Sequence, residues 1–196
     1  FYQWEDFHMI EALREPLERG WLQLFCVDSI DELSWYNFDD HQRVQLDWHL
    51  VYEQYLIAEF LPGLRRWNST PFLIMAGASF GGFHAVNFAL RYPDLVQRVV
   101  ALSGDYRSQK YVEGYFDDDV LANSPLDYLP TLSPEKLNPE IRQVEFRLAS
   151  GRWDFCLEPT QSLAQEFSRL GIPHQCHVWD DPGIHDWPLW QRQAQH

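Results

Sequence analysis

The segment Gly77-Ala78-Ser79-Phe80-Gly81-Gly82 constrains the fold of this chain more than any other part of the sequence. It matches the pattern G-x-S-x-G, and the residues around it matter as much as the match. The apolar run at residues 72–76 is too short for a helix and is typical of a buried parallel strand. Residues 83–90 follow with a helical pattern. A strand, a sharp turn and a helix form the arrangement in which a serine hydroxyl is lifted clear of a sheet edge.

The remaining sequence alternates between predicted strands and predicted helices. The other predicted strands are residues 21–27, 96–102, 144–149 and 174–179. The other predicted helices are residues 4–19, ended by Gly20; 45–64, with a kink or break near Pro62; and 159–170, capped by Gly171. Strands that alternate with helices of this length predict an α/β fold, with a mostly parallel sheet covered by helices on both faces.

Residues 105–140 interrupt this alternation with prolines, turn residues and three consecutive aspartates. We interpret them as an irregular excursion from a single domain that spans residues 1–196. An excursion of this kind either overhangs the functional site or forms a plain surface insertion. Its aromatic residues Tyr111, Tyr115 and Phe116 are candidates for a cap over a cleft.

Charge and apolar patterning exclude several kinds of partner. The net charge is −14 at pH 7, so a nucleic acid or an anionic membrane would repel the chain. No apolar run approaches the roughly 20 residues of a membrane-spanning helix. Cys26, Cys156 and Cys176 are scattered without C-x-x-C spacing, so we expect no metal site and no disulfide framework. Localisation and oligomeric state stay open.

A serine hydroxyl becomes a good nucleophile only when a base removes its proton, and the chain has eight histidines. His185 differs from the others because it lies in a turn, residues 182–187, just past the last predicted strand. A base on such a loop can reach the turn that contains Ser79. We therefore predict His185 as the base; the alternative is that His185 is an ordinary surface-loop histidine.

A carboxylate should orient this histidine and stabilise its protonated form. Asp154 follows the predicted strand at 144–149, and Ser79, Asp154 and His185 occur in the chain order of α/β-hydrolases. Three other acids remain rivals for the role: Glu158, Asp180 and Asp181. The N-terminus of the helix after Ser79 directs backbone N–H groups toward a developing oxyanion, so the Phe80 amide is a predicted donor.

These segments together resemble a known group of serine esterases. The resemblance rests on residues 77–82, on Ala-Leu-Ser-Gly at 101–104, on Gly-Arg-Trp-Asp-Phe at 151–155 and on Gly-Ile-His-Asp-Trp at 183–187. The chain is similar over nearly its whole length, least in residues 105–140, to the esterase D, feruloyl esterase and antigen 85 mycolyltransferase group. The resemblance implies an α/β-hydrolase-type fold in which Asp154 and His185 complete a triad with Ser79.

The resemblance also implies further structure before Phe1. In this group a strand and a Gly-rich loop precede the helix that matches residues 4–19, and the loop supplies the second oxyanion amide. By the strand order of the group, the strand would lie between residues 21–27 and 72–76. A sheet without a central strand would leave two rows of backbone groups unpaired, so we expect additional N-terminal residues in the native protein.

The leading hypothesis is therefore a serine esterase that cleaves a small-molecule carboxylic ester through an acyl-serine intermediate, without a metal or organic cofactor. The alternatives are an acyltransferase with the same three residues and a non-catalytic binding module with the hydrolase fold. The aromatic residues near the motifs indicate an apolar or aryl acyl group, with Trp153, Phe155 and Trp187 as candidate substrate contacts and Trp190 nearby.

Overall fold

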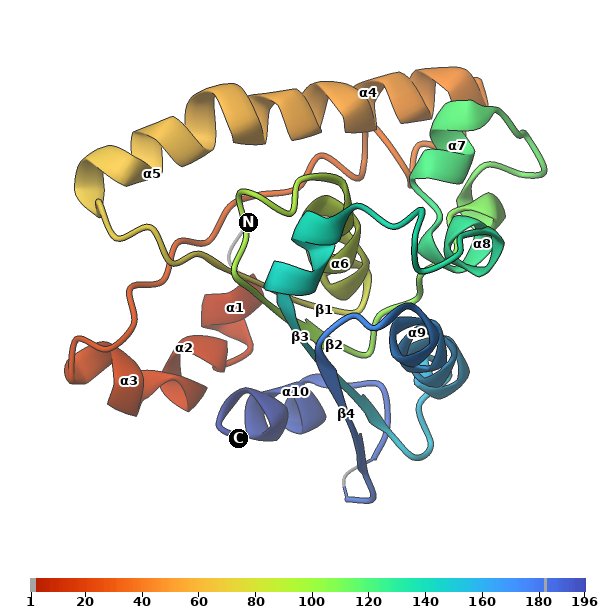
Figure 1. Cartoon of the computed structure of the whole chain (residues 1–196). Coiled ribbons are helices and arrows are strands. Elements are labelled where there is room, and N and C mark those ends of the chain that lie inside the picture. The colour runs from red at the N-terminus through yellow and green to blue at the C-terminus, as the bar shows by residue number, and fades with distance from the viewer. Residues whose placement is uncertain (1–2, 182) are drawn as a thin grey trace.

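The computed structural model of the protein describes residues 3–181 and 183–196. The strands of this part form one sheet in the order β1-β2-β3-β4, and every pairing is parallel (Figure 1). The strands are β1 (Ile74–Ala78), β2 (Arg98–Leu102), β3 (Glu145–Gly151) and β4 (His174–Trp179). The predicted parallel sheet is confirmed, although β1 begins and ends two residues later than the apolar run that predicted it.

Helices surround this sheet in the described part of the chain. The α-helices are α1 (Gln3–Asp6), α2 (Met9–Ala12), α3 (Arg14–Glu18), α4 (Gln42–Tyr55), α5 (Leu61–Trp67), α6 (Phe80–Arg91), α7 (Asp118–Ala122), α8 (Pro125–Tyr128), α9 (Leu157–Leu170) and α10 (Trp187–Ala194). A π-helical turn, η1 (Leu56–Phe60), joins α4 to α5, and short 3₁₀ turns are η2 (Gln109–Tyr111), η3 (Leu129–Thr131) and η4 (Pro139–Gln143). None of these helices is long and apolar enough to cross a membrane.

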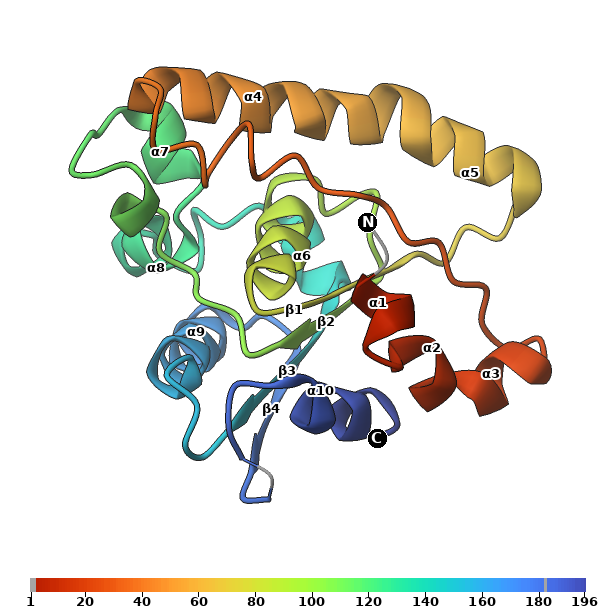
Figure 2. The same ribbon diagram turned by 180° about the vertical axis from the view of Figure 1, so that it is seen from behind.

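The two faces of the sheet are covered by different helices, as the opposite views show (Figures 1 and 2). Strand residues alternate between the faces. Val99 and Phe146 pack in the larger core with α6, α9 and the end of α4. Leu102 and Ala149 pack on the other face with Met9 of α2 and with α10. The predicted coverage of both faces is therefore confirmed.

The predicted strand at residues 21–27 was wrong. The segment is irregular, and the side chain of Trp21 is 69 % exposed. A strand requires a hydrogen-bonded neighbour. Among the described strands, β1 is the edge strand of the sheet and pairs only with β2, so no described strand lies at its outer edge to pair with residues 21–27. Apolar composition alone therefore did not make residues 21–27 a strand.

The predicted helix at residues 4–19 is divided into α1, α2 and α3. His8 interrupts it in the left-handed region, with φ of 56°. In a continuous helix the ring of Pro16 would clash with the carbonyl of Ala12, four residues earlier, and α2 ends at Ala12. Gly20 ends the segment as predicted: it has φ of 68°, and the Trp21 amide donates to the Pro16 carbonyl at 2.9 Å.

The long helix at residues 45–64 was predicted correctly in outline, but Pro62 does not break it. The chain stays helical from α4 through η1 to α5, and the π-helical turn ends two residues before the proline. Pro62 has no N–H to donate to the preceding turn, and a π turn accommodates the missing bond. Figure 1 shows α4 and α5 as one extended arm across the top of the molecule.

The excursion at residues 105–140 contains α7, α8 and short 3₁₀ turns, and packs against α4 and α6. Val112 and Val120 are buried with Phe80 and Phe83 in a separate apolar cluster. At the surface, Arg43 of α4 pairs with Asp117 at 2.9 Å and with Asp119 at 2.7 Å.

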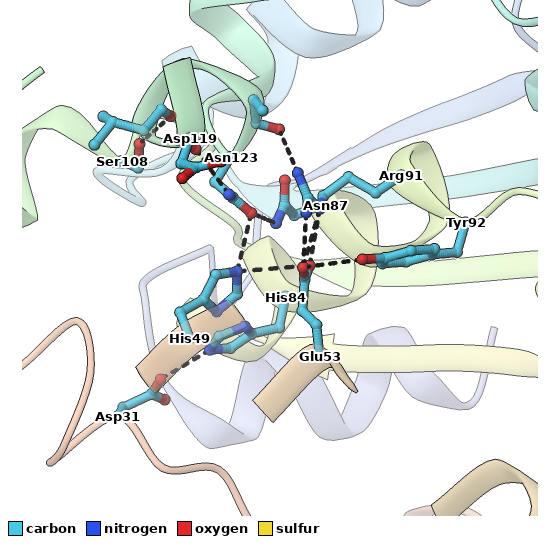
Figure 3. Close-up of polar contacts among 12 residues, drawn as sticks. Asp31, His49, Glu53, His84, Asn87, Arg91, Tyr92, Ser108, Asp119 and Asn123 are labelled. Atoms are coloured by element: carbon cyan, nitrogen blue, oxygen red, sulfur yellow. Dashed lines mark hydrogen bonds and ion pairs between the residues drawn. The ribbon is translucent and has the colours of Figure 1, made fainter. Parts of the chain in front are cut away.

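A buried polar network strengthens this contact between the excursion, α4 and α6 (Figure 3). The Asn123 side-chain oxygen accepts from Asn87 Nδ2 at 2.8 Å and lies 2.9 Å from His49 Nε2. The Asn123 side-chain oxygen can only accept hydrogen bonds, so His49 Nε2 is the ring nitrogen that carries a hydrogen and donates it. Glu53, one helical turn after His49, pairs with Arg91 of α6 at 2.9 Å. These bonds hold α6, which begins directly after the predicted nucleophile, in a fixed position.

Candidate active site

The turn between β1 and α6 holds Ser79 in a strained backbone conformation, with φ of 54°. A positive φ is uncommon for a residue with a Cβ atom. The Ser79 amide donates to the Leu102 carbonyl of β2 at 2.8 Å, which anchors the turn to the sheet. A Cβ atom on Gly77 would lie 2.2 Å from the Gly81 backbone, so the tight turn requires glycine at position 77. A Cβ atom on Gly81 itself would meet nothing within 4 Å, so packing does not require glycine at position 81.

Phe80 directly follows Ser79 and is the first residue of α6, so its amide lies at the N-terminus of this helix. Among the described residues, no backbone carbonyl accepts a hydrogen bond from it. A free N–H at the positive end of a 12-residue helix attracts negative charge. The position fits the predicted oxyanion donor.

Ser79, His185 and Asp154 come from three different strand ends and form one continuous chain of hydrogen bonds. The Ser79 hydroxyl donates to His185 Nε2 at 2.8 Å. His185 Nδ1 donates to Asp154 Oδ1 at 2.9 Å. The Asp154 side chain is completely buried and that of His185 is 16 % exposed. The structure thus brings together the three residues that the sequence singled out.

The environment of Asp154 favours its ionised form. Burial alone would raise the pKa of this carboxyl, but the hydrogen bonds from His185 and the Cys156 amide, together with the nearby Ser103 hydroxyl, hold the pKa below its ordinary value. An ionised carboxylate only accepts hydrogen bonds, so the proton between the two side chains belongs to His185 Nδ1. His185 Nε2 is consequently free to accept the Ser79 proton.

The local backbone presents both partners of Ser79. Asp154 lies in the turn between β3 and α9, where its Oδ1 also accepts from the Cys156 amide at 2.7 Å. His185 directly precedes α10, whose N-terminus is capped by the Asp186 carboxylate at 2.7 Å from the Trp187 amide. The sequence predicted only a turn at residues 182–187, and its first residue, Pro182, lies outside the described residues. Asp186 followed by Trp187 and Pro188 is a helix-start pattern that would have predicted α10.

The three rival acids do not reach His185. Glu158 accepts from Ser162 at 2.7 Å within α9. Asp180 pairs with Arg152. Asp181 is 93 % exposed and lies 3.9 Å from Arg192. Each therefore makes a surface contact that requires no catalytic role.

The aromatic candidates lie in different environments. Phe155 is 72 % exposed, and its ring lies 4.1 Å from that of His185. Trp153 is 74 % exposed. Trp187 instead stacks on Phe7 of the N-terminal segment, with ring centroids 4.6 Å apart and planes nearly parallel. Phe155 and Trp153 can therefore meet a ligand, whereas Trp187 is engaged in packing.

Two tyrosines extend the aromatic surface near the nucleophile. Tyr111 of the excursion contacts Phe80 with ring centroids 4.8 Å apart, and Tyr36 contacts Phe80 at 4.9 Å. Tyr115 contacts His41 instead, and Phe116 is 56 % exposed. Tyr111 thus lies against the residue that follows Ser79, and its role in a cap stays a prediction. No sequence pattern indicated Tyr36, because it lies in an irregular loop brought to Phe80 only by tertiary packing.

Asp154, Cys156 and His185 place potential metal ligands within 4.8 Å of one another in the described part of the chain. Burial and the negative charges of Asp154 and Asp105 raise the pKa of the Cys156 thiol to about 12. A protonated thiol is a poor metal ligand, and the other two side chains already share a hydrogen bond. We interpret the group as an acid–base pair beside a buried cysteine.

The geometry matches what comparison with known proteins finds. A family model described as "Putative esterase" matches residues 27–194, which is most of the chain. The chain belongs to this family. Membership confirms the predicted class, an ester hydrolase with the α/β-hydrolase fold.

Solved structures support the fold of this esterase-family chain. A ferulic acid esterase is 22 % identical with a TM-score of 0.72, and the match covers 99 % of this chain and 77 % of that one. The S-formylglutathione hydrolase FrmB from Staphylococcus aureus is 20 % identical with a TM-score of 0.54, covering 74 % of this chain and 60 % of that one. The enterobactin esterase FES from Shigella flexneri is 22 % identical with a TM-score of 0.55, covering 74 % and 36 %.

The chain thus spans less than two thirds of the length of the last two proteins. A search of curated proteins found no match. Likeness at this level of identity establishes the fold and not the substrate.

Proposed function

We propose that this protein hydrolyses carboxylic esters through an acyl-serine intermediate, with Ser79 as nucleophile, His185 as base and Asp154 as the orienting acid. The observation that carries the proposal is the unbroken hydrogen-bond chain from Ser79 Oγ through His185 to Asp154 Oδ1, with distances of 2.8 and 2.9 Å. Hydrogen bonds of this length at both nitrogens put the imidazole in the orientation that proton transfer requires.

Acylation begins when Ser79 Oγ attacks the ester carbonyl carbon and its proton passes to His185 Nε2. The Asp154 carboxylate stabilises the resulting imidazolium through Nδ1. The Phe80 amide donates to the carbonyl oxygen as that oxygen becomes negative. The tetrahedral species then collapses, the bond to the alcohol oxygen breaks, and His185 returns the proton to the leaving alcohol.

Deacylation repeats these steps with water as the nucleophile. His185 takes a proton from water as the water oxygen attacks the acyl carbon, and the Ser79 Oγ–acyl bond then breaks with return of that proton to Ser79. An alcohol in place of water would give acyl transfer with the same residues. Product analysis with a competing alcohol distinguishes hydrolysis from acyl transfer, because only transfer forms a new ester.

The exposed aromatic side chains support an apolar or aryl ester as the substrate. Phe155 lies against His185, Trp153 is exposed in the same turn, and Tyr36 and Tyr111 border Phe80. Rings in these places would stack on an aromatic group near the scissile bond. The likeness to a ferulic acid esterase favours the same class of ester.

Labelling with a fluorophosphonate probe, mapped by peptide mass, tests the proposal. Wild-type protein should carry the probe on Ser79, and Ser79→Ala should neither label nor hydrolyse p-nitrophenyl esters above about 10⁻⁴ of the wild-type rate. A matched control is Ser162→Ala, which removes an exposed hydroxyl bonded to Glu158. Folded wild-type protein that does not label, or Ser79→Ala with full activity, would refute the triad and favour the non-catalytic binding module.

A further inference from the structure

Two buried side chains outside the triad, Ser103 and Trp190, meet beside His185. Ser103 is the first residue after β2 and is fully buried; Trp190 lies in α10 and is 6 % exposed. The Trp190 indole Nε1–H donates to Ser103 Oγ at 3.0 Å. This bond links the helix that follows His185 to the sheet edge beside the turn of Ser79.

The Trp190 ring also contacts the predicted base. Its centroid lies 5.0 Å from that of the His185 imidazole, with the two planes at 89°. Phe155 contacts the same imidazole at 4.1 Å. An imidazole in contact with two aromatic rings has few alternative side-chain orientations, so its two hydrogen bonds stay aligned.

Ser103 has a hydroxyl hydrogen available for the acid. Its oxygen already accepts the indole N–H, so its own hydrogen is free to donate. Asp154 Oδ1 accepts hydrogen bonds from both His185 Nδ1 and the Cys156 amide. Asp154 Oδ2 is buried and has no partner of ordinary hydrogen-bond geometry in the described part of the chain. A buried carboxylate oxygen without a donor is costly, and the Ser103 hydroxyl also lowers the pKa of this carboxyl.

The backbone at Ser103 is held in place for this contact. Its φ is 54°, an unusual value for a residue with a Cβ atom. Its amide donates to the Ala149 carbonyl of β3 at 2.7 Å. A strained conformation that is anchored to a neighbouring strand is a common feature of functional sites.

We propose that Ser103 and Trp190 are positioning residues of this site. The indole N–H orients the Ser103 hydroxyl so that its hydrogen donates to Asp154 Oδ2, while the indole ring supports the His185 imidazole. One side chain of α10 thereby acts on both the acid and the base. The inference rests on the proposed function for the roles of Asp154 and His185.

Two variants separate the parts of this arrangement. Trp190→Phe keeps a ring against His185 but removes the N–H, and Ser103→Gly removes the hydroxyl while tolerating the positive φ. Each should lower kcat on a p-nitrophenyl ester by about ten- to a hundredfold, the loss expected for a hydrogen bond to a charged group. KM should stay within about twofold, since neither side chain meets substrate in the proposed mechanism.

The pH dependence distinguishes positioning from a general structural role. Loss of a donor to the carboxylate raises the proton affinity of the coupled Asp154–His185 pair. The acid limb of the kcat/KM profile should therefore move to higher pH in both variants. Matched controls are Trp179→Phe, a tryptophan packed in the same apolar cluster, and Ser108→Ala, a buried serine bonded to Val120 instead. Neither control should move the limb.

A proton NMR measurement tests the same contact without turnover. The His185 Nδ1–H, bonded to Asp154, should give a low-field resonance that shifts in Ser103→Gly and in Trp190→Phe and not in the controls. An unchanged resonance together with wild-type kcat and pH profile in both variants would overturn the proposal. If the resonance shifts in both variants but the wild-type protein hydrolyses no ester, the contact is upheld and the proposed function is refuted.

Discussion

The amide of Trp153 donates a hydrogen bond of 2.7 Å to the carbonyl of Gly183, and this bond joins the turn of Asp154 to the loop of His185. The two segments cross so closely that a Cβ atom on Gly151 would lie 2.2 Å from the Gly183 carbonyl oxygen. Gly183 has φ of 61° at the crossing, where glycine is favoured. The distance between acid and base therefore depends on two glycines that take no part in the chemistry.

Gly151→Ala should separate the acid from the base. The added methyl group cannot fit against the Gly183 carbonyl, so one loop must move, and a displacement of about 1 Å costs on the order of 10²-fold in rate. We expect kcat/KM to fall by about that factor in a protein that stays folded by circular dichroism. Gly63→Ala is the control, because its Cβ atom would meet nothing within 4 Å. Wild-type kcat/KM in Gly151→Ala would show that the crossing does not set the geometry.

Asp154→Asn should remove most of the turnover. A neutral amide would let the His185 ring adopt the wrong tautomer and would not stabilise the imidazolium, so kcat should fall roughly 10⁴-fold. Asp180→Asn is the matched control, since Asp180 pairs with Arg152 at the surface. Steady-state kinetics on one p-nitrophenyl ester compares them. A loss of less than about tenfold in Asp154→Asn would contradict its role.

Glu53→Gln should destabilise the fold in a pH-dependent way. Glu53 is 2 % exposed and pairs with Arg91 at 2.9 Å. Removing one partner of a buried pair leaves an uncompensated charge, so the free energy of unfolding at neutral pH should fall by about 3 kcal/mol.

The sign of the pH effect follows from the carboxyl. Burial of Glu53 raises its pKa, but His49 and Arg91 outweigh burial and hold the pKa below its ordinary value of 4.5. The ionised carboxylate therefore contributes stability above pH 4.5, and this contribution is lost as the pH falls through the lowered value. Urea unfolding should show wild type and Glu53→Gln converging in acid. The exposed Glu59→Gln is the control, and a constant difference at every pH would argue against the ion pair.

Phe155→Ala and Trp187→Ala should have different effects. Phe155 is exposed beside His185, so its loss should reduce kcat/KM more for aryl esters than for alkyl esters, by roughly two- to tenfold. Trp187 stacks on Phe7, so its loss should lower the free energy of unfolding by roughly 2 kcal/mol and leave the aryl preference unchanged. Kinetics on paired esters and urea unfolding measure the two effects. A changed aryl preference in Trp187→Ala would make Trp187 a substrate contact.

Local sequence was sufficient for the elements that need little tertiary context. The apolar run before Ser79, the glycines of the turn and the following helix predicted β1 and α6, because sharp turns and buried strands leave local patterns. The order Ser79, Asp154, His185 predicted which side chains converge, because the carboxyl ends of parallel strands meet at one edge of a sheet. Residues 21–27 show the limit: they are apolar enough for a strand, but a strand also needs a neighbour.

The sequence by itself therefore determined the α/β class, the position of each sheet strand to within about two residues and the three residues that meet at the site. The tertiary structure alone decided how those residues are held. Ser103, Trp190 and the crossing of Gly151 with Gly183 belong to segments far apart in the chain, and no local pattern encodes which side chains pack against each other. Hydrogen bonds and close contacts between such segments exist only once the sheet and α10 are assembled, which is why they had to be observed.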